Sequence, residues 1–317
     1  MKQALAITIA VISASASHAA ENIWATVQRD GRIHAMLNGR TVAAWQLEPL
    51  RNPKGGGKLA GSNFIHPLAT PSGFVTTDRQ PDDHMHHFGL WWPWKFVQID
   101  GQSHNTWEIQ HGGGAHVAGG LEIIPEGPGS IRWRLSSHIE TRGGNQEPRV
   151  VIRETTDLSL RLLNGRLMAL DMEIRQRAED ARVVIGKHHY SGFGWRGTPE
   201  WNAGNSKLVT SEGHDRENGN GEPVRWVLIT GERPGGQASV LLMSAAATHG
   251  QPERLRVWNA AAQSGRYFVN INPVALNDIP LDDEHPAVSH RRYRVITSDL
   301  EIEAAEAEAL WKSWLGK

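Results

Sequence analysis

The chain has 317 residues, with 33 Lys and Arg against 34 Asp and Glu, for a formal net charge of −1. This balance offers no concentrated basic face, so nucleic acid is not an expected partner. Cysteine is absent, which excludes disulfides and thiolate metal sites. A chain of this length can still bury a large core. All-β architectures often reach this size as one domain, so we expect a single domain over residues 21–317.

Residues 1–20 have the layout of a secretory signal peptide. A short basic start at Met1-Lys2-Gln3 precedes a small, apolar run over residues 4–16, and small residues lead up to Ala19 and Ala20. The run is shorter than the roughly 20 residues that a membrane-spanning helix needs. We therefore expect cleavage after Ala19 or Ala20, a periplasmic or secreted protein, and no membrane span.

Most of the remaining chain carries strand signals. Asn38-Gly39 and Asn164-Gly165 each separate two apolar runs and are typical of tight hairpin turns. The expected strands cover residues 23–27, 33–37, 41–47, 131–135, 150–162, 167–174, 224–229, 238–243, 266–271 and 291–297. Many short strands with Gly, Pro and Asn between them predict an all-β fold, an antiparallel β-sandwich or a large supersandwich.

Only the C-terminal segment has a convincing helical pattern. Ser298 with Glu301 three residues later matches a capping box. Apolar residues from Leu300 to Trp314 then form one stripe at helical spacing. We expect one C-terminal α-helix over residues 299–315, docked on the sandwich.

The densest group of titratable residues lies at Asp83-His84-Met85-His86-His87. Histidine titrates near neutrality and is the commonest metal ligand. Three interpretations stay open: acid–base catalysis with Asp83 orienting an imidazole, a metal site, and a hydrogen-bonded cluster that supports a loop.

The metal interpretation depends on the local backbone. In an extended segment His84 and His86 point to the same side. A divalent metal such as zinc or copper would then need a further ligand from elsewhere. The candidates are His188, His189 and Glu200, and we take His84, His86 and His188 as the set to test.

A second cluster runs from Lys187 to Arg196, directly after an apolar strand signal at residues 183–185. It therefore lies at a strand end that enters a glycine-rich turn, a common place for site residues. Arg196 could clamp a carboxylate or a pair of sugar hydroxyls. We expect the two clusters to face one cleft.

Weaker signals complete the set of candidates. The segment from His104 to Glu108 supplies another histidine and an acid, and Glu222 to Trp226 opens a strand with an acid, a base and an indole. The expected catalytic residues are Asp83, His84, His86, His87, His188, Arg196 and Glu222. The expected substrate-binding residues are Trp91, Trp92, Trp195, Lys187, Tyr190, Arg225 and Trp226.

Several of these motifs occur in the order of one known family. They are His66-Pro67-Leu68, Thr70-Pro71-Ser72-Gly73, Asp83 to Trp91, Gly192 to Arg196, Arg225-Trp226, Asn272-Pro273 and Tyr293-Arg294-Val295. From about residue 60 onward the chain resembles the PmoA-like family of secreted bacterial proteins. That name comes from a membrane methane-oxygenase subunit, whose transmembrane helices this chain lacks, so methane oxidation is not implied.

The resemblance implies a β-sandwich of unknown function that is associated with bacterial glycan use. Met85 and Phe88 stand where the usual pattern has Pro and Arg. Loss of that arginine removes an anion clamp.

Composition points in the same direction, because the chain has 13 Trp against six Phe and three Tyr. Flat indole faces suit sugar rings, although core tryptophans are equally common. We expect an exported carbohydrate-active enzyme of hydrolase or lyase type that acts on a glycan or small sugar.

The two enzyme types need different side chains. Glycoside hydrolysis commonly needs two carboxylates, for which Asp83, Glu200 and Glu222 are candidates. A lyase or epimerase would use a His, Tyr or Lys base instead. Two alternatives remain: a non-catalytic glycan-binding sandwich with exposed tryptophans, and a His-ligated metal-dependent oxidoreductase.

Overall fold

The computed structural model describes residues 22–52, 54, 56–127, 129–143, 147–179, 182–246 and 252–316, with the backbone alone at residues 56–59. The expected signal peptide, residues 1–20, lies outside the described residues. Within the described ranges, no helix is both long enough and apolar enough to cross a membrane.

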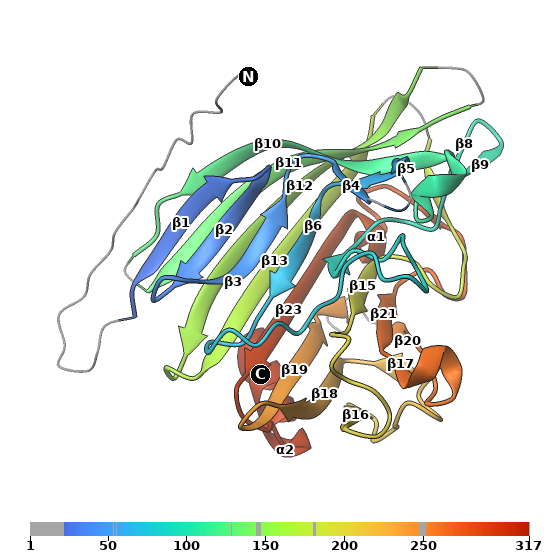
Figure 1. The fold of residues 1–317 in the computed structure, drawn as a ribbon. Coiled ribbons are helices and arrows are strands. Elements are labelled where there is room, and N and C mark those ends of the chain that lie inside the picture. Colours follow the sequence, from blue (N-terminus) through green and yellow to red (C-terminus); the bar gives the residue numbers. More distant parts are fainter. Residues whose placement is uncertain are drawn as a thin grey trace.

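Two large antiparallel sheets form the described part of the chain (Figure 1). The first has nine strands in the order β1 (Trp24–Arg29), β2 (Arg32–Leu37), β3 (Arg40–Gln46), β6 (Phe64–Leu68), β7 (Leu90–Trp91), β15 (Phe193–Arg196), β21 (Phe268–Asn272), β20 (Glu253–Val257) and β17 (Pro223–Val224). The second has eight, in the order β10 (Gly114–Ile124), β11 (Ser130–Thr141), β12 (Arg149–Leu163), β13 (Leu167–Ala178), β23 (His290–Ser298), β19 (Gly236–Ser244), β18 (Trp226–Arg233) and β16 (Ser206–Thr210).

Two smaller sheets lie at the end of the sandwich. One contains β22 (Ile279–Pro280), β14 (Val184–Gly186), β8 (Phe96–Ile99) and β9 (Gln102–Asn105). The other is the hairpin of β4 (Leu50–Asn52) and β5 (Gly56–Gly61). The predicted all-β sandwich is confirmed.

The predicted hairpin turns form because their residues tolerate left-handed backbone. Asn38 and Gly39, between β2 and β3, have φ values of 50° and 79°. Asn164 and Gly165, between β12 and β13, have 51° and 70°. Positive φ at both central residues matches the right-handed twist of the flanking strands. The strands expected over residues 224–229 and 238–243 extend toward each other, since β18 continues to Arg233 and β19 begins at Gly236.

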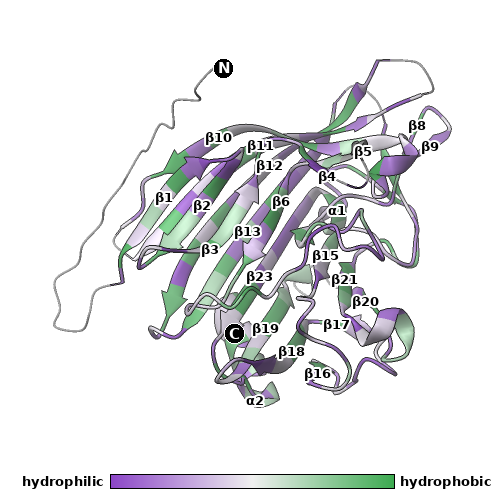
Figure 2. Cartoon of the chain, in the orientation of Figure 1, coloured by the Kyte–Doolittle hydropathy of each residue, from purple (hydrophilic) through white to green (hydrophobic). Residues whose placement is uncertain are grey.

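The main core lies between the two large sheets. Alternate residues of facing strands enter it, including Trp45, Trp133, Leu170 and Val240, and Figure 2 shows hydrophobic and hydrophilic residues alternating along these strands. Twelve of the 13 tryptophans are buried, and Trp314 is half-buried. The tryptophan excess therefore builds core and does not mark an exposed sugar-binding surface.

The C-terminal helix is present but begins later than expected. Helix α2 spans Ala304–Leu315, because Ser298 is the last residue of β23 and its hydroxyl accepts the N–H of Leu300 at 3.0 Å in a turn. Leu300 is 55% exposed and does not join the apolar stripe. Ala307 and Trp311 pack α2 against Trp226 and its neighbours. A single helical turn, α1 (Pro286–Ser289), was not predicted.

Candidate functional site

The outer face of the first sheet carries an aromatic layer around β7, β15 and β21. Strand alternation sends Phe193 and Trp195 of β15 into the core, while Gly194 and Arg196 face the other way. A Cβ at Gly194 would lie 3.2 Å from Trp107 and 3.3 Å from Trp91. Glycine there lets both indoles lie directly on the strand. The layer comprises Phe64, Phe88, Trp91, Trp107, Trp258 and Phe268.

The three histidines of the first cluster pack on this layer. The ring centroid of His84 lies 4.7 Å from that of His87 and 5.5 Å from that of His86. His87 is buried and stacks on Phe268 at 4.7 Å, and burial lowers its pKa well below the ordinary value. His84 contacts Trp258 at 4.7 Å. His87 therefore belongs to the packing, while His84 and His86 remain half-buried.

The backbone of this cluster is not extended, which corrects the assumption behind the metal hypothesis. His84 N–H donates to the carbonyl of Pro81 at 3.1 Å, and His87 N–H donates to that of His84 at 2.9 Å. Two successive turns therefore replace a strand, and the alternation argument for His84 and His86 does not apply.

An ion pair joins the two sequence clusters. Arg196 Nη2 donates to both carboxylate oxygens of Asp83, at 2.9 and 2.7 Å. The guanidinium is fully buried and lies 4.9 Å above the ring of Trp258. Burial alone would raise the pKa of Asp83, but the hydrogen bonds and charge of Arg196 outweigh it and lower that pKa. The pair brings the two segments into contact. The cavity described below is lined by neither segment, so a shared cleft stays a prediction.

Glu108 is a buried carboxylate at the centre of the site, although its sequence pattern marked it only as a weak candidate. Its two oxygens accept hydrogen bonds from Lys95 Nζ and from the Tyr190 hydroxyl. Burial alone would raise the pKa of Glu108, but these two bonds and the Lys95 charge lower it to about 2. Burial, together with the Glu108 carboxylate, raises the pKa of Tyr190. At neutral pH the carboxylate is ionised and the phenol keeps its proton.

His84 and His86 lie in the field of this carboxylate but stay neutral. Burial lowers the pKa of His86 to about 4, and the Glu108 charge only partly opposes that shift. Burial also lowers the pKa of His84. The Nδ1 of His86 lies 3.3 Å from Gln110 Nε2. Both imidazoles can therefore accept a proton at pH 7.

His188 supports Tyr190 and does not reach the first cluster. Its Nδ1 lies 3.1 Å from the carbonyl oxygen and 3.3 Å from the backbone nitrogen of Tyr190, and the two rings lie 4.3 Å apart. Among the described residues, no three His, Asp or Glu side chains are grouped so as to hold a metal ion. The set of His84, His86 and His188 does not fit a metal, because His188 faces Tyr190 and Phe96.

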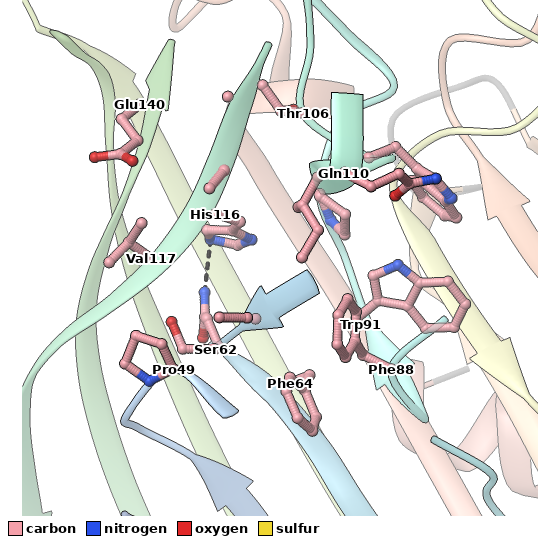
Figure 3. A pocket seen from close by; sticks show the side chains of 18 of the residues that line it. Pro49, Ser62, Phe64, Phe88, Trp91, Thr106, Gln110, His116, Val117 and Glu140 are labelled. Carbon is pink, nitrogen blue, oxygen red and sulfur yellow. Dashed lines mark hydrogen bonds between the residues drawn. The ribbon is translucent and has the colours of Figure 1, made fainter. Parts of the chain in front are cut away.

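A cavity of 570 Å³ adjoins the aromatic layer (Figure 3). In this view Phe88 and Trp91 form one wall, with His116 and Val117 opposite. The 3₁₀ turn η1 (Ile109–His111) covers one side, and Gln110 both lines the cavity and contacts His86. Gln110 therefore links the cavity to His86, although His84, His86, Glu108 and Tyr190 do not themselves line it.

A family model matches residues 32–312. The chain belongs to DUF6807, a family of unknown function. This match corrects the resemblance to the PmoA-like family drawn from the motifs. No curated protein matches this DUF6807 chain. Among solved structures, a GalM/aldose epimerase homologue from C. elegans is similar over 92% of this chain and 100% of its own, with a TM-score of 0.34 and 6% identity.

Four residues expected to bind substrate in this DUF6807 chain have structural contacts elsewhere. Trp92 is fully buried and its Nε1 donates to Glu154 at 2.9 Å. Trp195 is fully buried between the sheets. Arg225 and Trp226 both donate to Glu308 of α2, at 3.1 and 2.8 Å, so they attach the C-terminal helix.

Three further candidate site residues lie on loops or strand ends away from the histidine cluster. The carbonyl of Glu222 accepts the N–H of Leu255 at 2.9 Å, next to β17. Glu200 is exposed in the loop after β15, and Lys187 is exposed with its backbone N–H bonded to Asp278 at 2.6 Å. Of the expected substrate-binding residues, Trp91 and Tyr190 lie at the described site.

Proposed function

We propose that this protein is an exported, carbohydrate-acting enzyme whose proton transfers run through His84 and His86, beside Tyr190 and Glu108. One observation carries the proposal. Two segments about a hundred residues apart in sequence meet at the Asp83–Arg196 pair. There the neutral imidazole of His86 lies in the field of Glu108, the ionised carboxylate to which the Tyr190 hydroxyl donates. Titratable groups whose surroundings drive their pKa values apart are the usual acid and base of a catalytic site.

The protonation states favour a lyase or epimerase over a two-carboxylate hydrolase. Hydrolysis by two carboxylates requires one of them to be protonated at working pH. The pKa values of Asp83 and Glu108 are both lowered, so both groups are ionised near neutrality. A neutral histidine is left as the base. The Tyr190 hydroxyl donates its one proton to Glu108, so its oxygen is left to accept a hydrogen bond from a substrate hydroxyl and position it.

The supporting residues hold this arrangement. Lys95 fixes one oxygen of Glu108, and the other oxygen orients the Tyr190 hydroxyl. The Asp83–Arg196 pair fixes the loop that carries His84 and His86. Such preorganisation is what a proton transfer at a defined carbon or oxygen needs.

The alternative of a non-catalytic binding sandwich requires exposed tryptophans and histidines with a purely structural role. Twelve tryptophans are buried, and two of the three clustered histidines are half-buried beside ionisable groups. A sugar remains the favoured substrate class, because the adjoining cavity combines apolar walls with hydrogen-bonding groups, and its charged residues Glu140 and Arg142 pair with each other at 2.6 Å.

The test is a screen of the purified protein against mono- and disaccharides in deuterated water, followed by proton NMR. We expect deuterium incorporation, epimerisation or elimination at one sugar carbon. His86→Gln and Tyr190→Phe should each abolish it, while the exposed His285→Gln, 40% exposed beside Asp282, should leave it unchanged. Equal rates in wild type and His86→Gln would exclude the proposed base, and no reaction with any sugar would exclude the substrate class.

A further inference from the structure

Strand β20 places an arginine, Arg256, on the outer face of the first sheet, where the aromatic layer lies. Leu255 and Val257 of this strand point into the main core, so strand alternation sends Arg256 to the opposite face. Trp258 follows two residues later and belongs to the aromatic layer. Arg256 therefore lies on the same side of the sheet as the histidine cluster.

Hydrogen bonds hold the turn that carries Tyr190 over this part of the sheet. Arg256 pairs across the ladder with Asn270 of β21, the neighbouring strand (Figure 1). Residues directly opposite each other in an antiparallel pair point to the same face. The Asn270 side chain accepts the N–H of Ser191 at 3.0 Å and donates to the carbonyl of Ser191 at 3.1 Å. The register therefore places Arg256 beside the residue that anchors the chain directly after Tyr190.

The charge of Arg256 has no carboxylate partner among the described residues. The side chain is half-buried, and its Nη1 donates to the side chain of Asn220 at 3.0 Å. Its Nη2 has no hydrogen bond within the described ranges and is not among the buried atoms. Burial, then His188 and then Arg256 lower the pKa of His189, so this charge acts on the neighbouring turn. The guanidinium is therefore free to receive an anion there.

The two ion pairs of the site are each electrically neutral. Asp83 pairs with Arg196, and Glu108 pairs with Lys95. Arg256 adds a positive charge that neither pair compensates. A guanidinium binds a carboxylate through two parallel N–H···O bonds, and Nη1 and Nη2 of Arg256 can supply them end-on. The charge and the fork geometry together favour a ligand with a carboxylate.

We propose that Arg256 binds the carboxylate of an acidic sugar, a uronic acid unit, and that the carbon bearing this carboxylate is the one that loses its proton to His86. The choice of carbon rests on the proposed function; the binding of the carboxylate does not. A carbon–hydrogen bond of a sugar ring becomes acidic when a carboxylate beside it has its charge offset by a cation. A phosphate or sulfate ester would meet the same arginine without acidifying a carbon, so the carboxylate is the favoured anion.

The proposed step balances between the substrate and His86. The imidazole takes the proton from C5 of the uronate, and the electron pair of that bond moves into the carboxylate group. Return of a proton to C5 completes exchange or epimerisation. Alternatively the C4–O bond breaks and a C4–C5 double bond forms, and the leaving oxygen takes the proton back from His86.

Affinities for matched acidic and neutral sugars test the arginine directly. The probes are galacturonic acid and glucuronic acid, compared with galactose and glucose in calorimetric or NMR titrations. Glucose 6-phosphate serves as an anion that has no carboxylate. We expect at least one uronic acid to bind about tenfold more tightly than its neutral counterpart, as a charge-assisted hydrogen bond provides, and more tightly than glucose 6-phosphate.

Substitutions on β20 assign the preference to one side chain. Arg256→Gln should weaken binding of the uronic acid about tenfold to a hundredfold and leave the affinity for the neutral sugar unchanged. Arg256→Lys should recover part of that loss, because it keeps the charge but not the fork. Arg254→Gln is the matched control and should change neither affinity, since Arg254 lies two residues away on the same face and donates to the carbonyl of Gly221 at 3.0 Å.

Three outcomes would overturn the carboxylate site. They are neutral sugars that bind as tightly as both uronic acids, glucose 6-phosphate that binds more tightly than both, and equal losses of uronic acid affinity in Arg256→Gln and Arg254→Gln. The first two are measured on the wild-type protein and do not depend on the folding of any variant.

His86→Gln separates this proposal from the catalytic one. It should keep the preference for the uronic acid while losing deuterium exchange at C5. If the preference depends on Arg256 but wild type and His86→Gln exchange C5 at equal rates, the carboxylate site stands and the proposed proton-transfer site fails.

Discussion

Replacing Asp83 with alanine tests whether the two sequence clusters form one physical unit. The substitution removes both acceptors of Arg196 Nη2, at 2.9 and 2.7 Å. Nε and Nη1 of the same guanidinium are already buried without partners. A fully buried cation would then be left with the ring of Trp258 and the charge of Asp78.

The cost follows from burial. Removing one partner of a buried ion pair destabilises a protein by about 3–5 kcal/mol. The Asp83 side chain is 23% exposed, so water partly solvates the arginine that loses its partner. The lower end of this range of destabilisation therefore applies. We predict a loss of about 3 kcal/mol. The neighbouring Asp82→Ala should cost about 0–1 kcal/mol, because Asp82 and its partner Lys54 are 79% and 65% exposed.

Urea unfolding at pH 7 measures both values from the shift in midpoint at constant slope. Adding Arg196→Met to Asp83→Ala should recover part of the loss, since it removes the stranded charge. A cost below about 1 kcal/mol for Asp83→Ala, or one equal to that of Asp82→Ala, would show that the pair is an ordinary surface contact and refute the reasoning.

Three other substitutions test separate parts of the account. Tyr190→Phe should lower turnover about 10²–10⁴-fold with little change in melting temperature, as steady-state rates and calorimetry can check. Glu154→Gln should destabilise the fold by about 2–4 kcal/mol, because it disturbs a buried network of five donors. Since the folded pKa of Glu154 lies below its unfolded value, wild-type stability should fall as pH drops below about 4.5, and the Gln variant should lack that contribution in acid unfolding. Gly194→Ala should cost about 1–3 kcal/mol by crowding Trp91 and Trp107, and an unchanged urea midpoint would contradict the packing described.

Local patterns predicted much of the fold because they are set by neighbouring residues. Asn-Gly pairs at positions 38–39 and 164–165 dictate the hairpins through backbone conformation alone. The start of α2 was predicted too early because a capping box and a strand-end turn share the same residue types. The Ser298 hydroxyl satisfies Leu300 N–H in the turn, which no local pattern distinguishes.

The site could be predicted only in part, since its members come together through tertiary packing. Both histidine-bearing segments stood out by composition, and the structure joins them through Asp83 and Arg196. Glu108 did not stand out, because a lone glutamate acquires its properties from Lys95 and Tyr190 across the fold. The sequence signal that pointed to Glu108 was its place directly after Trp107, at the end of the segment from His104 to Glu108.

The pH dependence of kcat/KM on the sugar found by the screen tests the central claim most directly. Burial lowers the pKa of His86 to about 4, so the neutral base persists well below the ordinary histidine value of about 6.5. We predict an acid limb near pH 4 and no turnover in His86→Gln. A limb near pH 6.5, or a profile that His86→Gln leaves unchanged, would contradict the assignment of His86 as the base.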